Sequence, residues 1–157
     1  ALLDSEQAKR QWIEPDLADI QLHPPLLPLL SQLWMKFRRQ DIAHEDWVHK
    51  THLQVAIAAR IQHGPQAIDL MREGIQRLNA KHGIAQTPEG GYHETLTCVW
   101  CKLVELATPE VVDEERLEQI LMRLTDKNLP LQYYSRERML SWEARTTWLE
   151  PDLAALS

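Results

Sequence analysis

A chain of 157 residues with 44% hydrophobic and 25% charged residues has the size and composition of a soluble globular protein. Its formal net charge of -6 argues against a nucleic-acid partner, because affinity for a phosphate backbone depends on clustered Lys and Arg. Two cysteines and no apolar run near the roughly 20 residues of a membrane helix argue against a disulfide scaffold and a membrane span. We expect a single cytoplasmic domain over residues 1–157.

A nonapeptide near the start of the chain returns near its end. "WIEPDLADI" at 12–20 and "WLEPDLAAL" at 148–156 are identical at six of nine positions. Proline suits the first turn of a helix, and an aspartate beside it suits the positive end of the helix dipole, so a reused helix start explains the pair. The alternative is that both ends occupy equivalent grooves, for example across a homodimer.

Helical periodicity, interrupted by Gly and Pro, dominates the rest of the sequence. No alternating strand pattern and no Asn-Gly hairpin signal occur. The third predicted helix is typical, since Ile68, Met71, Ile75 and Leu78 recur at helical spacing. The sequence therefore predicts an all-α protein, a compact bundle of five or more helices. The predicted helices are 26–39, 43–62, 66–82, 93–107 and 112–126, with shorter turns near 135–149.

Two histidines of the second predicted helix, His49 and His52, are the first candidate site residues. They are three positions apart, so they share one helix face, and that face is the apolar one. A single histidine on such a face is usually a core residue with satisfied hydrogen bonds. A pair followed by the small Ala56 and Ala59, which leave open space, indicates a site for a divalent metal ion or for acid–base chemistry.

The fourth predicted helix begins at "GGYHET" and contributes two more candidates. On a helical wheel His93 borders the apolar face, whereas Glu94 lies off it. An acidic residue at a helix N-terminus is favourable by itself, but Glu94 is close enough to His93 to serve as a catalytic group. Cys98 and Cys101 form an isolated C-x-x-C without a second pair, and we interpret them as free cysteines.

The C-terminal stretch "QYYSRERMLSWEARTTW" carries the remaining candidates. Tyr134 is able to orient a substrate or transfer a proton, and Arg145 is able to grip a carboxylate with two parallel hydrogen bonds. Ser135 and Ser141 are explained at least as well by helix capping.

The segments "VHKTHLQVA", "GYHET" and "YYSRERMLSWEARTTWLEPDL" together resemble a bacterial family of small helical proteins with no settled activity. The resemblance touches about two-thirds of the chain. This chain has Trp47 and Val48 where the family often has Phe-Thr, so the following helix must be capped differently. The positions to which the resemblance points are His49, His52, Tyr92, His93, Glu94, Thr95, Tyr134, Ser135, Ser141, Arg145, Glu150 and Asp152.

The leading hypothesis from the sequence is a metal-dependent small-molecule enzyme. Three neutral imidazoles, those of His49, His52 and His93, would hold a divalent ion in a pocket between two helices and leave one coordination position open. Glu94 or Tyr134 would transfer protons.

Arg145 would bind an anionic substrate in that enzyme. Two alternatives stay open at this point. One is a metal-independent enzyme in which the three histidines act as acid, base and orienting group. The other is a non-catalytic ligand-binding or interaction module whose histidines satisfy one another in a polar core.

Overall fold

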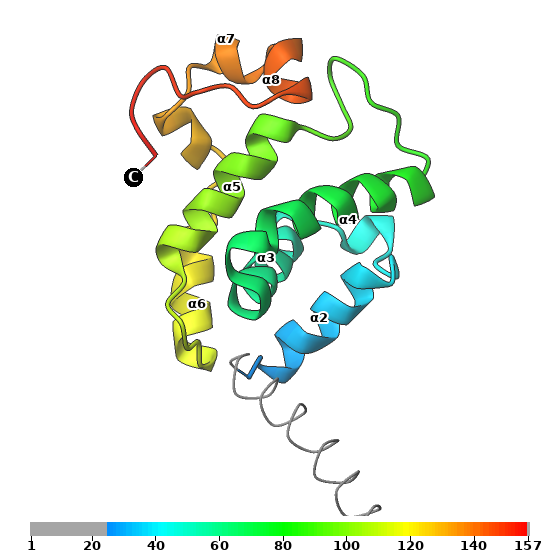
Figure 1. Ribbon diagram of the computed structural model, residues 1–157, viewed down its shortest axis with the longest axis vertical. Coiled ribbons are helices and arrows are strands. Elements are labelled where there is room, and N and C mark those ends of the chain that lie inside the picture. Colours follow the sequence, from blue (N-terminus) through cyan, green and yellow to red (C-terminus); the bar gives the residue numbers. More distant parts are fainter. Residues whose placement is uncertain (1–24, 157) are drawn as a thin grey trace, which may run out of the picture.

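The computed structural model describes residues 25–156, in which helices are the only regular secondary structure (Figure 1). The all-α prediction is confirmed for this part of the chain, while the N-terminal copy of the nonapeptide lies outside it. Short 3-10 helices are η1 (His44–Asp46), η2 (Gly64–Gln66) and η3 (Leu129–Gln132). The α-helices are α2 (Pro28–Arg38), α3 (His49–His63), α4 (Ala67–Lys81), α5 (Glu94–Ala107), α6 (Glu114–Arg123), α7 (Arg136–Met139) and α8 (Trp142–Thr146).

Four of the five predicted helices agree with observed ones to within a few residues, but the second, 43–62, is wrong at its start. The chain first forms η1, becomes extended at Val48 (φ -102°, ψ 171°), and enters α3 only at His49. The Thr51 hydroxyl donates a 2.8 Å hydrogen bond to the carbonyl of Asp46, which ties the 3-10 turn to the new helix. His49 therefore stands in the first turn of α3.

Helix α3 is the central element of the fold, and α2, α4, α5 and α6 all pack against it (Figure 1). The residues from Leu53 to Ala59 are all buried, including the polar Gln54. A helix surrounded by four others has no solvent face over its middle turns, so the amphipathic prediction does not hold there.

Helix α2 packs against α3 and α4 through a close approach at one glycine. A Cβ atom added at Gly74, in the middle of α4, would overlap the ring of Phe37. The ring is 1% exposed and stacks on both Trp34 and Trp47, with centroids 5.8 Å and 5.5 Å away. Glycine is thus needed at this position because an aromatic ring fills the space of its side chain.

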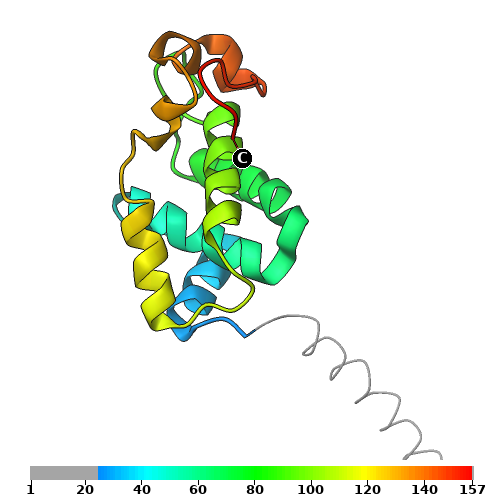
Figure 2. The same ribbon diagram turned by 90° about the vertical axis from the view of Figure 1, so that its left-hand side faces the viewer.

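The C-terminal segment, orange to red in Figures 1 and 2, gathers at one end of the bundle, where α8 packs on α5. The predicted serine caps are confirmed. The Ser135 hydroxyl accepts a 3.2 Å hydrogen bond from the amide of Arg138, and the Ser141 hydroxyl accepts a 3.1 Å bond from that of Ala144. Within residues 25–156 no helix is long and apolar enough to cross a bilayer.

The second copy of the nonapeptide, 148–156, is not helical, so the predicted helix start is wrong for this copy. Its Asp152 carboxylate accepts a 2.8 Å hydrogen bond from the amide of Ser135. The amide of Leu153 donates a 2.9 Å bond to the carbonyl of Tyr133. These hydrogen bonds hold the segment against the corner between η3 and α7 in a non-helical conformation.

Candidate functional site

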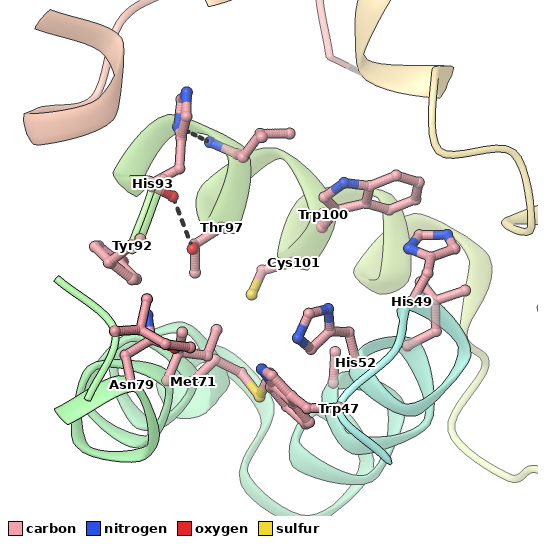
Figure 3. A pocket seen from close by; sticks show the side chains of 16 residues that line it. Trp47, His49, His52, Met71, Asn79, Tyr92, His93, Thr97, Trp100 and Cys101 are labelled. Carbon is pink, nitrogen blue, oxygen red and sulfur yellow. Dashed lines mark hydrogen bonds between the residues drawn. The ribbon is translucent and has the colours of Figure 1, made fainter. Parts of the chain in front are cut away.

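A cavity of about 350 Å³ lies between α3, α4 and α5, and we call it the main cavity (Figure 3). It opens between the helix that carries His49 and His52 and the start of the helix that follows His93. The sequence places the candidate pocket between the same two helices. Helix α4 supplies the third wall through Met71, Ile75 and Asn79.

The lining of the main cavity is mostly apolar. Two indole rings, those of Trp47 and Trp100, stand at the end occupied by His49 and His52 (Figure 3). Among the described lining residues there is no Asp, Glu, Lys or Arg. Such a pocket, with few polar groups in apolar walls, is typical of small-molecule sites.

His52 is the polar group at the centre of this arrangement. Its Nε2 atom is buried and has no hydrogen-bond partner, and its ring stands edge-on to Trp47 with the centroids 3.9 Å apart. Burial, followed by the charges of His49 and Lys127, lowers the pKa of His52 to about 4. The imidazole is therefore neutral at pH 7 and offers one donor and one acceptor nitrogen. Leaving a buried nitrogen unpaired costs roughly 1–3 kcal/mol. Nε2 has less than 1 Å² of accessible surface, so a ligand in the cavity is able to recover this cost only when the His52 ring turns toward it.

His49 borders the same cavity, but one of its nitrogens serves the fold. Its Nε2 atom lies 3.0 Å from the carbonyl of Leu124, 75 positions along the chain. A carbonyl only accepts, so Nε2 carries the proton and donates. The ring also stands edge-on to Trp100, with centroids 4.8 Å apart. His49 thus joins the start of α3 to the end of α6.

His93 uses both ring nitrogens for the backbone. Its Nδ1 accepts a 3.1 Å hydrogen bond from the amide of Leu96, which makes the imidazole the N-cap of α5. Its Nε2 therefore carries the proton and donates a 2.8 Å bond to the carbonyl of Met139. Burial is the main cause that lowers the pKa of His93, and the Arg145 guanidinium acts in the same direction.

The three histidines consequently do not converge on one point. The His93 ring points away from the cavity and from His52 (Figure 3), and no lone pair of that ring is left for a metal ion. Within residues 25–156, no three His, Cys, Asp or Glu side chains are close enough together to hold a metal ion. The metal site stays a prediction, and this arrangement of side chains does not support it.

Glu94 lies outside the lining and belongs to an ion-pair network. The Arg72 Nε atom donates to both of its carboxylate oxygens, at 2.6 Å and 2.9 Å, and the Tyr92 hydroxyl donates to Oε2 at 2.9 Å. This network joins α4 to the first turn of α5 and raises the pKa of Arg72. These contacts support a structural role for Glu94 at the N-terminus of α5 over a catalytic role.

Tyr134 and Arg145 also lie outside the lining. The Tyr134 hydroxyl donates a 2.6 Å hydrogen bond to the carbonyl of Leu149, and burial raises the pKa of Tyr134 to about 12. Arg145 is 8% exposed, and its Nη1 donates a 3.2 Å bond to the carbonyl of Gly91, a residue of the cavity rim. Both side chains hold the C-terminal segment in place, and their predicted catalytic roles stay predictions.

Cys101 is a cavity residue that the sequence reasoning missed. Its sulfur faces the cavity between Thr97 and Trp100 (Figure 3), whereas the sequence indicates only a free cysteine. Burial raises the pKa of Cys101 to about 12, so the group is a neutral thiol. The small Ala56, which the sequence does associate with open space, lines the same cavity.

No family model, no curated protein and no solved structure matches the chain. The resemblance inferred from the three motifs therefore stays a hypothesis.

Proposed function

We propose that the main cavity binds a small, neutral, largely apolar molecule, and that His52 supplies the hydrogen bond that orients it. The observation that carries this proposal is a neutral imidazole in the lining of an apolar cavity whose buried Nε2 atom has no partner and pairs with a ligand when the ring turns toward the cavity. A volume of about 350 Å³ falls within the range of small-molecule pockets. The aromatic rings of Trp47 and Trp100 favour a flat or ring-containing ligand.

The same contacts favour binding over acid–base catalysis. A base with a pKa of about 4 is poorly matched to proton transfer at neutral pH. The Tyr92 hydroxyl is engaged by Glu94, and Cys101 is a neutral thiol. His49 also lines the cavity, but its Nε2 atom is engaged by the carbonyl of Leu124. A ligand-binding module is therefore the better supported alternative.

The test compares two probes of similar shape, p-cresol and toluene, which differ by one hydroxyl group. Their affinities are measured by quenching of tryptophan fluorescence and by calorimetry on the wild type and on His52→Phe. We expect p-cresol to bind about 10-fold more tightly than toluene to the wild type, which corresponds to one net hydrogen bond. In His52→Phe the two probes bind equally, because the ring is kept and its nitrogens are lost.

The control variant is Thr51→Val, which alters the neighbouring residue that contacts Asp46 instead of the cavity. It keeps the preference for p-cresol. Equal affinities of the two probes for the wild type, or an unchanged preference in His52→Phe, would contradict the proposal. Elemental analysis of untagged protein tests the metal hypothesis separately, since stoichiometric metal that is lost in His52→Phe would replace our proposal.

A further inference from the structure

A second cavity, of about 370 Å³, lies on the same three helices. Helix α3 lines it with Ala56 and Arg60, α4 with Ala67 and Ile68, and α5 with Cys98, Cys101 and Lys102. The side chains of Trp148 and Leu156 from the C-terminal segment complete it.

The two cavities follow each other along the bundle. On α3, His52 lines the main cavity, Ala56 lines both, and Arg60 lines the second, so successive turns of one helix face pass from one to the other. Helix α4 repeats the order, with Ile75 in the main cavity and Ile68 in the second. The two cavities therefore follow one another along the contact between α3, α4 and α5.

The partition between them is formed by small side chains. Ala56 of α3 and Cys101 of α5 are the two residues that line both cavities. Both side chains are small, a methyl group and a thiol, and they separate the two cavities where α3 packs on α5. Ala56 is 7% exposed, which places it inside the contact between the helices.

The two cavities differ in the charged residues of their linings. Among the described residues, the main cavity has no Lys or Arg, whereas the second has Arg60 and Lys102. The Lys102 Nζ atom lies 3.7 Å from the Oε2 atom of Glu105, which also lines the second cavity. Arg60 has no acidic partner within residues 25–156. An arginine without a counter-ion beside an apolar cavity is suited to a carboxylate, which it is able to bind through two hydrogen bonds.

We propose that the two cavities form one groove for an elongated amphiphilic carboxylate. Its apolar chain passes between Ala56 and Cys101 into the main cavity, and its carboxylate is bound by Arg60 in the second. This inference rests on one part of the proposed function, that the main cavity accepts an apolar group; the alkyl chain makes no hydrogen bond with His52. From Arg60 to His52 the axis of α3 rises about 12 Å, so a medium-chain fatty acid spans both cavities.

The experiment uses laurate, its uncharged analogue dodecanol, and p-cresol as a probe of the main cavity alone. All are titrated below the concentrations at which the amphiphiles form micelles. We expect laurate to bind the wild type at least 10-fold more tightly than dodecanol and to compete with p-cresol. In Arg60→Gln, laurate binds no better than dodecanol, while p-cresol binding is unchanged.

A second variant, Ala56→Leu, places a larger side chain between the two cavities. We expect it to weaken the binding of laurate by more than 10-fold. Arg60→Gln tests the same inference where Ala56→Leu fails to fold. Simultaneous binding of laurate and p-cresol, without competition, would overturn the single groove. Equal affinities of laurate and dodecanol would overturn the role of Arg60. A wild type that binds laurate but not p-cresol would instead contradict the proposed function of the main cavity.

Discussion

The low pKa of His52 predicts that protonation of this residue destabilises the folded protein in acid. In the folded protein the pKa is about 4, against 6.5 for a solvated histidine. Above pH 6.5 the imidazole is neutral in both states. As the pH falls below 6.5 the unfolded chain takes up a proton that the folded chain refuses, so stability is lost until the pH reaches about 4.

The size of the effect follows from the two pKa values. Each pH unit between them is worth about 1.4 kcal/mol, which gives a loss of about 3 kcal/mol over the whole interval and about 2 kcal/mol between pH 7 and pH 5. His52→Phe removes the titrating group and keeps an aromatic ring against Trp47. Its stability at pH 7 is equal to or above that of the wild type, because an unpaired buried nitrogen is lost.

The measurement is urea unfolding of the wild type and His52→Phe at pH 7 and pH 5. We expect the wild type to lose about 2 kcal/mol more than the variant over this interval. The lowered pKa of His93 acts in the same direction but is present in both proteins, so it cancels. The control is Ile57→Val, which removes one buried methylene group and keeps the acid sensitivity of the wild type. Equal losses in the wild type and His52→Phe would refute the reasoning.

Two further substitutions test the packing and the cap. On helix propensity alone Gly74→Ala would stabilise α4 by about 1 kcal/mol; because Phe37 occupies the space, we expect a net destabilisation of about 1–2 kcal/mol in urea unfolding, which Phe37→Leu relieves. His93→Ala loses the N-cap of α5 and is destabilised by about 1–2 kcal/mol, whereas His93→Asn keeps a capping side chain and recovers part of the loss. Both His93 variants bind p-cresol as the wild type does, and a loss of binding in the folded His93→Asn protein would show that this ring belongs to the site.

The helices were predictable because their signals are local. Prolines and glycines mark their ends, and apolar residues at helical spacing mark their interiors, so 66–82 and 93–107 agree closely with α4 and α5. The start of α3 was mispredicted although the contact that fixes it is local, since a side-chain hydrogen bond from Thr51 to Asp46 leaves no mark in the spacing of apolar residues. The nonapeptide at 148–156 was mispredicted for a different reason, because its hydrogen bonds are made with Ser135 and Tyr133 in an earlier segment.

The sequence by itself determined the helical class, the caps at Ser135 and Ser141, and the approximate place of a cavity beside His49 and His52. Only the tertiary structure decided what each histidine does. His49 and His93 have the same chemistry as His52, but their Nε2 atoms meet carbonyl groups 75 and 46 positions away. Helical periodicity predicts the helix face on which a side chain lies. The packing of distant segments decides which group forms a hydrogen bond with its nitrogen. That packing leaves the Nε2 atom of His52 unpaired.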